Sequence, residues 1–192
     1  NTEVAYMGCR TRVMGNVYDP SHETTCGRGN LSFTSINLPR LGIEAHGDIN
    51  KFFTDLDGML ELVIRQLLHR FKIQAAKLGR NYPFLMGQGV WLDSEKLKED
   101  DTVGEILKHG TLSVGFIGLA ETLKALVGSH HGETQEAQSL GLVIVGFMRK
   151  KLDEQSKKTG FNYTLLATPA EGLSGRFVKI DRAKYGVIEG VT

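Results

Sequence analysis

The side chain in the most distinctive chemical setting is the thiol of Cys9, within Met-Gly-Cys-Arg-Thr-Arg at residues 7–12. The preceding glycine lets a ligand or another stretch of backbone approach closely, and Arg10 and Arg12 favour anionic groups nearby. Cys9 is therefore a candidate reactive thiol. The alternative is a buried and inert thiol, which is a common state of free cysteine.

A carboxamide further along the chain has a similar setting. Asn30 closes the segment Gly-Arg-Gly-Asn at residues 27–30, and its amide offers a ligand both a donor and an acceptor. The alternative is an asparagine in a left-handed turn. Cys26 is either a second redox thiol or, as we favour, a small buried hydrophobic residue.

A third candidate segment follows a β-rich run at residues 162–167. Thr168 suits the N-cap of a helix, Pro169 suits the first helical position, and Glu171 suits the reciprocal partner of a capping box. The pattern predicts a strand that runs directly into a helix.

The same junction is a candidate phosphate site, because a helix N-terminus carries free amides and partial positive charge. On physical grounds alone a capped helix without a ligand is favoured, since Glu171 would repel phosphate unless it turned back toward the cap. The residues of this candidate site are Thr168, Pro169, Ala170, Glu171, Gly172 and Ser174.

Common nucleotide and hydrolase motifs are incomplete. The Gly-x-Gly segments that begin at Gly27 and Gly87 lack the third glycine of a dinucleotide fingerprint. No phosphate loop ending in Gly-Lys-Ser or Gly-Lys-Thr occurs, and the glycine spacing around Ser174 does not fit a serine hydrolase elbow.

The histidines predict no metal site. His130, His131 and Glu133 are near neighbours at a loop-to-helix boundary, where their side chains diverge, so helix capping is the favoured role. The other histidines are scattered and are expected to be structural or exposed: His22, His46, His69 and His109.

Composition limits the function further. The 192 residues include 23 Lys and Arg against 22 Asp and Glu, so net charge alone would not recruit nucleic acid or an anionic membrane. No apolar run is long enough to span a membrane and no signal core is visible, which predicts a cytoplasmic protein. Two cysteines cannot form a disulfide framework.

Alternating elements must position these residues. Apolar spacing and turn residues predict a single domain over residues 1–192 with an α/β fold, in which ligands lie beyond the carboxyl ends of the strands. The sequence begins at Asn1 and ends on Thr192 without a closing element, which suggests a piece of a longer chain. Expected strands are 12–17, 31–36, 111–116 and 162–167; expected helices are 48–71, 94–98, 101–109, 118–127 and 133–158; and 81–91 is expected to be extended.

Five long blocks resemble the anaerobic (class III) ribonucleoside-triphosphate reductase family. They occur in the family's order, and the resemblance extends over essentially the whole chain. The blocks are Tyr6–Val13, Gly27–Arg40, Pro83–Gly89, His109–Glu121 and Asn162–Phe177. The resemblance implies part of a ten-stranded α/β barrel of the glycyl radical enzyme type. A finger loop at about 6–30 would thread its centre, and a later half-barrel would occupy about 31–192.

The resemblance also implies roles for the candidate residues. Cys9 matches the cysteine that becomes a transient thiyl radical and takes a hydrogen atom from the ribose 3′ carbon. Asn30 matches an asparagine that orients the sugar hydroxyls. The segment from Thr168 to Ser174 matches a turn that contacts the substrate phosphates.

The family implies cofactors and partners that this chain does not supply. They are a glycyl radical made by an S-adenosylmethionine and iron–sulfur activase, formate as reductant, structural zinc, ATP and dATP effectors, a ribonucleoside triphosphate substrate and a homodimer. The chain lacks the glycyl radical motif, the four-cysteine zinc site, the second active-site cysteine and the effector region, so the fragment alone is expected to be inactive. Alternatives are a nucleotide-binding or assembly module without chemistry, and a glycyl radical lyase.

Overall fold

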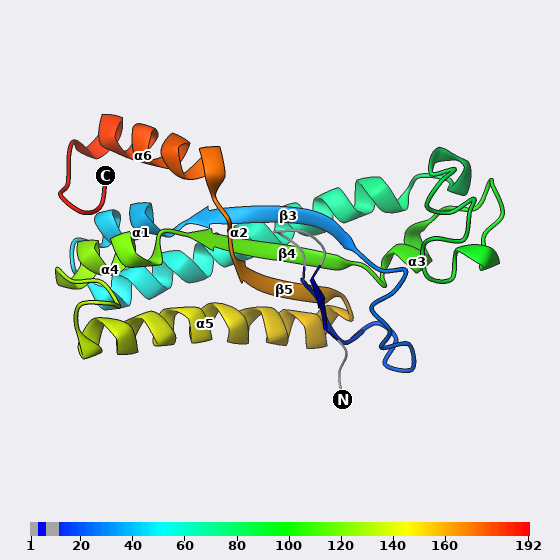
Figure 1. Cartoon of the computed structure of the whole chain (residues 1–192), viewed down its shortest axis with the longest axis horizontal. Coiled ribbons are helices and arrows are strands. Elements are labelled where there is room, and N and C mark those ends of the chain that lie inside the picture. Colours follow the sequence, from blue (N-terminus) through cyan, green and yellow to red (C-terminus); the bar gives the residue numbers. More distant parts are fainter. Residues whose placement is uncertain (1–3, 7–11) are drawn as a thin grey trace. The chain divides into compact units, whose positions relative to one another are not determined.

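The computed structural model describes residues 4–6 and 12–192 (Figure 1). Cys9 lies outside these ranges. The chain divides into two compact units. The first comprises residues 1–34, 63–114 and 152–166, and the second comprises residues 35–62, 115–151 and 167–192.

A three-stranded parallel sheet has the order β3-β4-β5 (Figure 1). The strands are β3 (Asn30–Asn37), β4 (Thr111–Ile117) and β5 (Asn162–Ala167). In the central strand β4, residues 111–116 are all buried, as expected for a parallel strand whose two faces are both covered. The expected α/β class is confirmed, and the three expected strands from 31 onward are present within one or two residues.

The first crossover, between β3 and β4, contains α1 (Leu38–Ala45) and α2 (Ile49–Ala75). Asp48 Oδ1 accepts a hydrogen bond from the Lys51 amide at 3.0 Å, which confirms the expected cap of α2. The sequence analysis missed α1, which begins beside Pro39 and ends at His46 in the left-handed conformation. The buried face of α2 carries Phe52, Leu56, Leu60, Val63, Leu67 and Phe71, all expected positions.

The second crossover contains α4 (Leu119–Val127) and α5 (Gln135–Thr159). Gly128 ends α4 with φ 79°, as the sequence indicates. The apolar spacing of this helix predicts one buried stripe: Ala137, Leu140, Leu142, Val145, Met148 and Leu152. The prediction is wrong at Leu142, which is 70% exposed, while Ile144 is fully buried. Ala137, Met148 and Leu152 are buried as expected.

Residues 76–110 connect α2 to β4 through short elements: η1 (Gly79–Asn81), η2 (Ser94–Lys96) and α3 (Gly104–Leu107). The expected extended segment at 81–91 is wrong, because its amides turn back onto nearby carbonyls, as from Met86 to Tyr82 at 2.9 Å. Trp91 is buried at the end of this segment, and its indole donates to the Ile106 carbonyl at 2.8 Å.

Two further pieces complete the described chain. At the N-terminus, β1 (Ala5–Tyr6) pairs antiparallel with β2 (Arg12–Val13), and after β5 comes α6 (Glu171–Tyr185). Among the described residues, no helix combines the length and apolar character that crossing a membrane requires.

The turn at Gly118 gives a first prediction. Gly118 has φ 80°, and a Cβ built there would lie 2.3 Å from Cγ of Pro39. Gly118→Ala should therefore lower the free energy of unfolding by about 2–4 kcal/mol, since backbone strain and overlap add. Urea unfolding checks this. The control is Gly58→Ala on α2, where nothing lies within 4 Å, and equal losses in both variants would contradict the prediction.

Candidate functional site

Cys9 is the third of the five residues, 7–11, that connect β1 to β2, and all five lie outside the described residues. The flanking strands are in register, with Ala5 opposite Val13 and Tyr6 opposite Arg12. Val13 is fully buried. The structure therefore describes the base from which the Cys9 segment extends, within the first unit.

Asn30 opens β3. The residue before it is fixed to the neighbouring strand, because the Gly29 carbonyl accepts a hydrogen bond from the Thr111 amide at 2.9 Å. The Oδ1 atom of Asn30 is buried and has no hydrogen-bond partner among the described residues. Because a buried carboxamide oxygen without a partner is costly, this atom is suited to accept a hydrogen bond from a ligand hydroxyl.

Thr168 does not cap α6 as the sequence predicted. Its amide donates to the Phe116 carbonyl at 2.9 Å, and its hydroxyl lies 2.9 Å from the hydroxyl of Ser35. The helix starts at Glu171, its N-cap position is Ala170, and no side chain caps it. The capping-box prediction is wrong because Thr168 still belongs to the sheet edge, where strand contacts use both its amide and its hydroxyl.

The first turn of α6 is nevertheless accessible. Glu171 is exposed and adopts φ 41°, a conformation that is uncommon outside glycine. Ser174 Oγ donates to the Glu171 carbonyl at 2.9 Å, so this hydroxyl is already engaged with the backbone. A Cβ on Gly172 would meet nothing within 4 Å, which leaves room beside the helix start.

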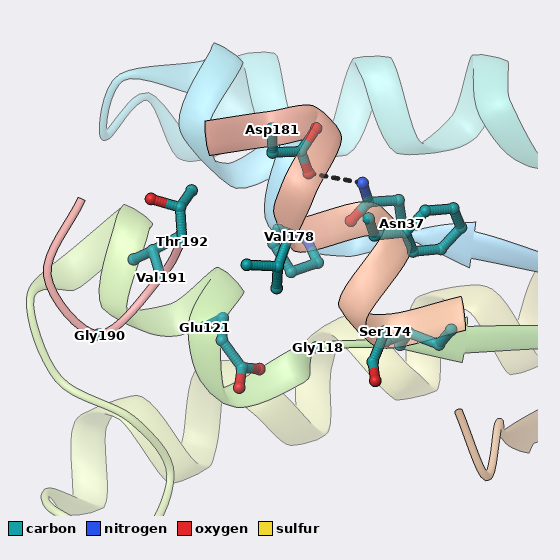
Figure 2. A pocket seen from close by; sticks show the side chains of 12 residues that line it. Asn37, Gly118, Glu121, Ser174, Val178, Asp181, Gly190, Val191 and Thr192 are labelled. Atoms are coloured by element: carbon teal, nitrogen blue, oxygen red, sulfur yellow. Dashed lines mark hydrogen bonds between the residues drawn. The ribbon is translucent and has the colours of Figure 1, made fainter. Parts of the chain in front are cut away.

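A pocket of about 400 Å³ lies beyond the carboxyl ends of β3 and β4 in the second unit, and Ser174 lines it (Figure 2). This is the usual place for a ligand in an α/β sheet. Glu121 on α4 faces the pocket and has no ion pair among the described residues. Its carboxylate disfavours phosphate in the pocket itself.

The other acidic group of the pocket is neutralised. Asp181, which is 2% exposed, accepts hydrogen bonds from Arg40 Nε and Asn37 Nδ2, both at 2.7 Å (Figure 2). A second Arg40 nitrogen, Nη2, donates to the same Asp181 oxygen at 2.5 Å. This ion pair joins α6 to the start of α1 and closes one wall of the pocket.

A second set of contacts holds the end of α6. Glu44 on α1 accepts hydrogen bonds from the Tyr185 hydroxyl and from Lys184 Nζ, the latter at 3.0 Å. These bonds, the one from Tyr185 first, lower the pKa of Glu44. A lowered carboxylate pKa stabilises the fold at neutral pH, and the contribution is lost as the pH falls through the folded-state value.

The sequence analysis missed a buried polar cluster in the first unit. Asn16, Arg28, His109 and Asn162 are each at most 4% exposed. Their hydrogen bonds join segments that lie far apart in the sequence, as between Asn16 and His109, which are 93 residues apart. No local pattern marks such partners, and His109 was expected only to be structural or exposed. Among the described residues, no group of three or more acidic, histidine or cysteine side chains is arranged to hold a metal ion.

These features define an α/β protein with a pocket at the carboxyl ends of its parallel strands. A family profile described as anaerobic ribonucleoside-triphosphate reductase matches residues 1–191. The chain belongs to this family.

Relatives support the assignment over nearly the whole chain. The anaerobic ribonucleoside-triphosphate reductases of Salmonella typhimurium and Escherichia coli are 36% and 35% identical over 189 residues. Each alignment covers 97% of the chain and 26% of the relative, so the chain spans about a quarter of their length. The phage T4 reductase is 31% identical over 195 residues, covering 98% of the chain and 30% of that protein.

Solved structures show the same fold. The Thermotoga maritima anaerobic ribonucleotide reductase with citrate in its active site matches with a TM-score of 0.65 at 19% identity, over 86% of this chain and 28% of that one. The same enzyme with dATP bound in the specificity site matches with a TM-score of 0.62 at 19% identity, over 83% of this chain and 25% of that one.

The Arg40–Asp181 pair gives a second prediction. Arg40→Met leaves a buried carboxylate without its cation, so the free energy of unfolding should fall by about 2–4 kcal/mol in urea unfolding. The control is Lys51→Met, which removes the exposed ion pair with Asp55 and should leave the unfolding midpoint close to that of the wild type. Equal shifts of the urea unfolding midpoint in the two variants would contradict the prediction that the buried Asp181 carboxylate depends on Arg40.

Proposed function

We propose that the full-length protein containing this chain reduces ribonucleoside triphosphates to deoxyribonucleoside triphosphates by thiyl radical chemistry, with Cys9 as the thiyl residue. The observation that carries the proposal is the family match over residues 1–191, which includes Cys9 and Asn30. The chain on its own is expected to be inactive, because it spans only about a quarter of its bacterial relatives.

The antiparallel pair β1–β2 supports this role for Cys9. Cys9 is the middle residue of the five that connect these two paired strands. We propose that this connection is the tip of a finger loop at the centre of a ten-stranded barrel, of which β3, β4 and β5 are three strands.

In the proposed reaction the Cys9 thiyl takes the hydrogen atom from the ribose 3′ carbon, and the 2′ hydroxyl then leaves as water. The cysteine returns the hydrogen atom to the same carbon after the sugar has been reduced, with formate as the overall reductant. Asn30 would accept a hydrogen bond from a sugar hydroxyl through Oδ1, the buried atom that has no partner among the described residues.

The substrate phosphates would contact the start of α6. We propose that they approach from the side of Gly172, where the space is open, and not through the pocket beside Glu121. Partial positive charge at a helix N-terminus favours this arrangement. The proposed substrate-binding residues remain Thr168, Pro169, Ala170, Glu171, Gly172 and Ser174.

The cofactors of the family do not fit within this chain. It has two cysteines, so a four-cysteine zinc site needs residues from elsewhere in the protein. We propose that a glycyl radical outside this chain, generated by a separate S-adenosylmethionine and iron–sulfur activase, supplies the radical to Cys9. We also propose a homodimer with ATP and dATP as effectors. The dATP in the specificity site of the Thermotoga maritima enzyme supports dATP as an effector.

The role of Cys9 gives a third prediction. In the activated full-length protein, Cys9→Ser should reduce deoxyribonucleotide formation to background, because a serine hydroxyl does not exchange its hydrogen with the ribose so readily. The expectation that Cys26 is a buried hydrophobic residue is wrong, because Cys26 is an exposed free cysteine. Cys26→Ser is therefore the matched control, and it should retain turnover within about twofold of the wild type.

Each other outcome points to a different function. Nucleotide binding unchanged by Cys9→Ser in a protein that never turns over would favour a binding or assembly module. Competition of a small carbon substrate with the triphosphate would favour a glycyl radical lyase. Turnover by Cys9→Ser would refute the thiyl role.

The role of Asn30 gives a fourth prediction. Asn30→Ala should lower kcat/KM for the nucleotide about 10- to 100-fold, the loss expected for one hydrogen bond to the reacting sugar. Asn50→Ala, at an exposed position in the first turn of α2, is the control and should leave kcat/KM unchanged. Similar values for the two variants would remove Asn30 from the proposed site.

A further inference from the structure

The buried polar cluster of the first unit holds the chain directly after β2. Arg28 donates from Nη1 to the Met14 carbonyl and from Nε to the His109 carbonyl, both at 2.8 Å. It also donates to the carbonyls of Gly15 and Thr24, at 3.4 and 3.1 Å. One guanidinium therefore ties the segment that follows β2 to the residues that lead into β4.

Asn162, the first residue of β5, fixes the next residues. Its Oδ1 accepts a hydrogen bond from the Val17 amide at 2.7 Å. Because a backbone amide can only donate, the orientation of the Asn162 carboxamide is determined, and Nδ2 must be the group that faces Asn16 Oδ1 at 3.2 Å. The same Nδ2 lies 3.1–3.3 Å from the carbonyls of residues 108–110.

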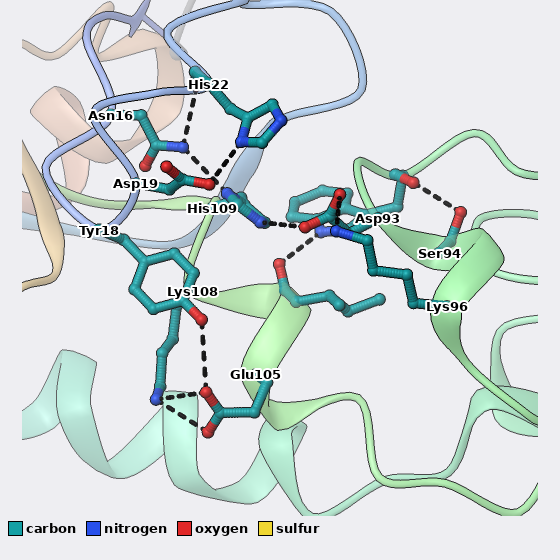
Figure 3. Close-up of polar contacts among 12 residues, drawn as sticks. Asn16, Tyr18, Asp19, His22, Asp93, Ser94, Lys96, Glu105, Lys108 and His109 are labelled. Carbon is teal, nitrogen blue, oxygen red and sulfur yellow. Dashed lines mark hydrogen bonds and ion pairs between the residues drawn. The ribbon is translucent and has the colours of Figure 1, made fainter.

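The orientation of Asn16 follows from that of Asn162. Its Oδ1 accepts from Asn162, so its Nδ2 donates to the His22 carbonyl at 3.1 Å and to His109 Nδ1 at 2.9 Å (Figure 3). Nδ1 of His109 is therefore an acceptor without a proton. The imidazole proton lies on Nε2, 3.2 Å from Asp93 Oδ2.

Charged and aromatic neighbours enclose the imidazole. Lys96 and, after it, His109 lower the pKa of Asp93 by hydrogen bonding, which keeps an ionised acceptor beside Nε2. The ring of Tyr18 packs edge-on against His109 at 5.0 Å between centroids, and Lys108 lies over the other side of that tyrosine (Figure 3). The His109 ring thus meets the segment leading from β2 through the hydrogen bond from Asn16 and the packing of Tyr18, whereas its other ring hydrogen bond goes to Asp93, in the segment before β4.

We propose that Asn16, His109 and Asn162 are positioning residues, which set the place of the β1–β2 pair against β4 and β5 and thereby the place of Cys9. The inference rests on the proposed thiyl role of Cys9. The Val17 amide is hydrogen-bonded to Asn162, and only three residues separate Val17 from the buried Val13 of β2. The connection between the cluster and β2 is therefore short, and a shift of the cluster would move β2. A displacement of about 1 Å at a reacting atom can cost about 100-fold in rate.

Two substitutions at His109 separate positioning from stability. His109→Asn places an acceptor where Nδ1 stood and keeps the bond to Asn16, whereas His109→Gln places its amide near the former Nε2 and keeps the bond to Asp93. Each variant loses one of the two bonds of the buried imidazole. A purely structural role predicts similar losses of melting temperature and of activity in both.

The positioning role predicts a different result in the activated full-length protein. His109→Gln should lower kcat about 10- to 100-fold with KM within about twofold of the wild type, while His109→Asn keeps at least about a third of the kcat. With substrate deuterated at the 3′ carbon, the isotope effect on kcat should rise in His109→Gln, because a misplaced Cys9 slows hydrogen abstraction. A lower fraction of folded protein would leave the isotope effect unchanged.

Equal kcat values and unchanged isotope effects in the two His109 variants would overturn the positioning role. If His109→Gln does not fold, Asn16→Ser removes the same bond from the other side and is expected to show the same loss of kcat. Failure of both to fold would also overturn the inference, because the cluster would then be required for the fold itself. Cys9→Ser in the same preparation distinguishes failure of the positioning role from failure of the proposed function. The proposed function fails only if Cys9→Ser turns over.

Discussion

Burying a polar side chain is costly unless its hydrogen bonds are made, and this constraint governs the polar cluster of the first unit. Asn16, Arg28, His109 and Asn162 are all buried. The side chains of Asn16, Arg28 and Asn162 bond to backbone carbonyls or amides, and the His109 ring bonds to the side chains of Asn16 and Asp93. The orientation of one carboxamide determines the next, so the cluster has one consistent arrangement of donors and acceptors. The segment after β2 is thereby held against β4 and β5.

In the second unit the central buried polar group is a carboxylate with an arginine partner. The buried carboxylate of Asp181 on α6 accepts hydrogen bonds from Arg40 and Asn37, and the bond from Arg40 joins α6 to α1. Glu44 performs a similar task at the last turn of α6, through Lys184 and Tyr185. Most of the α6 surface is exposed, with Asp181 its one buried residue, so these polar contacts are a main attachment of this helix.

Local patterns predicted much of the fold. The apolar spacing from Phe52 to Phe71 indicated α2, and the strand composition of residues 111–116 indicated β4. The predictions failed where a distant partner decided the outcome. Thr168 bonds to Ser35 across the sheet instead of capping α6, and α1 was missed because the pattern around residues 38–45 was interpreted as part of a broken, glycine-rich segment.

The candidate site was predictable only in part. Asn30 was identified from its glycine setting, and the structure adds that its Oδ1 is buried without a partner among the described residues. The cluster around His109 was not predictable, because Asn162 and Asn16 are 146 residues apart and neither lies in a pattern that implies the other. Resemblance supplied the role of Cys9, which the residues around it left open.

The central claim is that Cys9 exchanges a hydrogen atom with the substrate sugar in the full-length protein. The most direct test follows product formation by the activated full-length protein from a ribonucleoside triphosphate deuterated at the 3′ carbon. The account predicts slower turnover than with unlabelled substrate, together with a product that keeps the deuterium at that carbon. Equal rates for the two substrates at saturation and at low concentration would contradict the account.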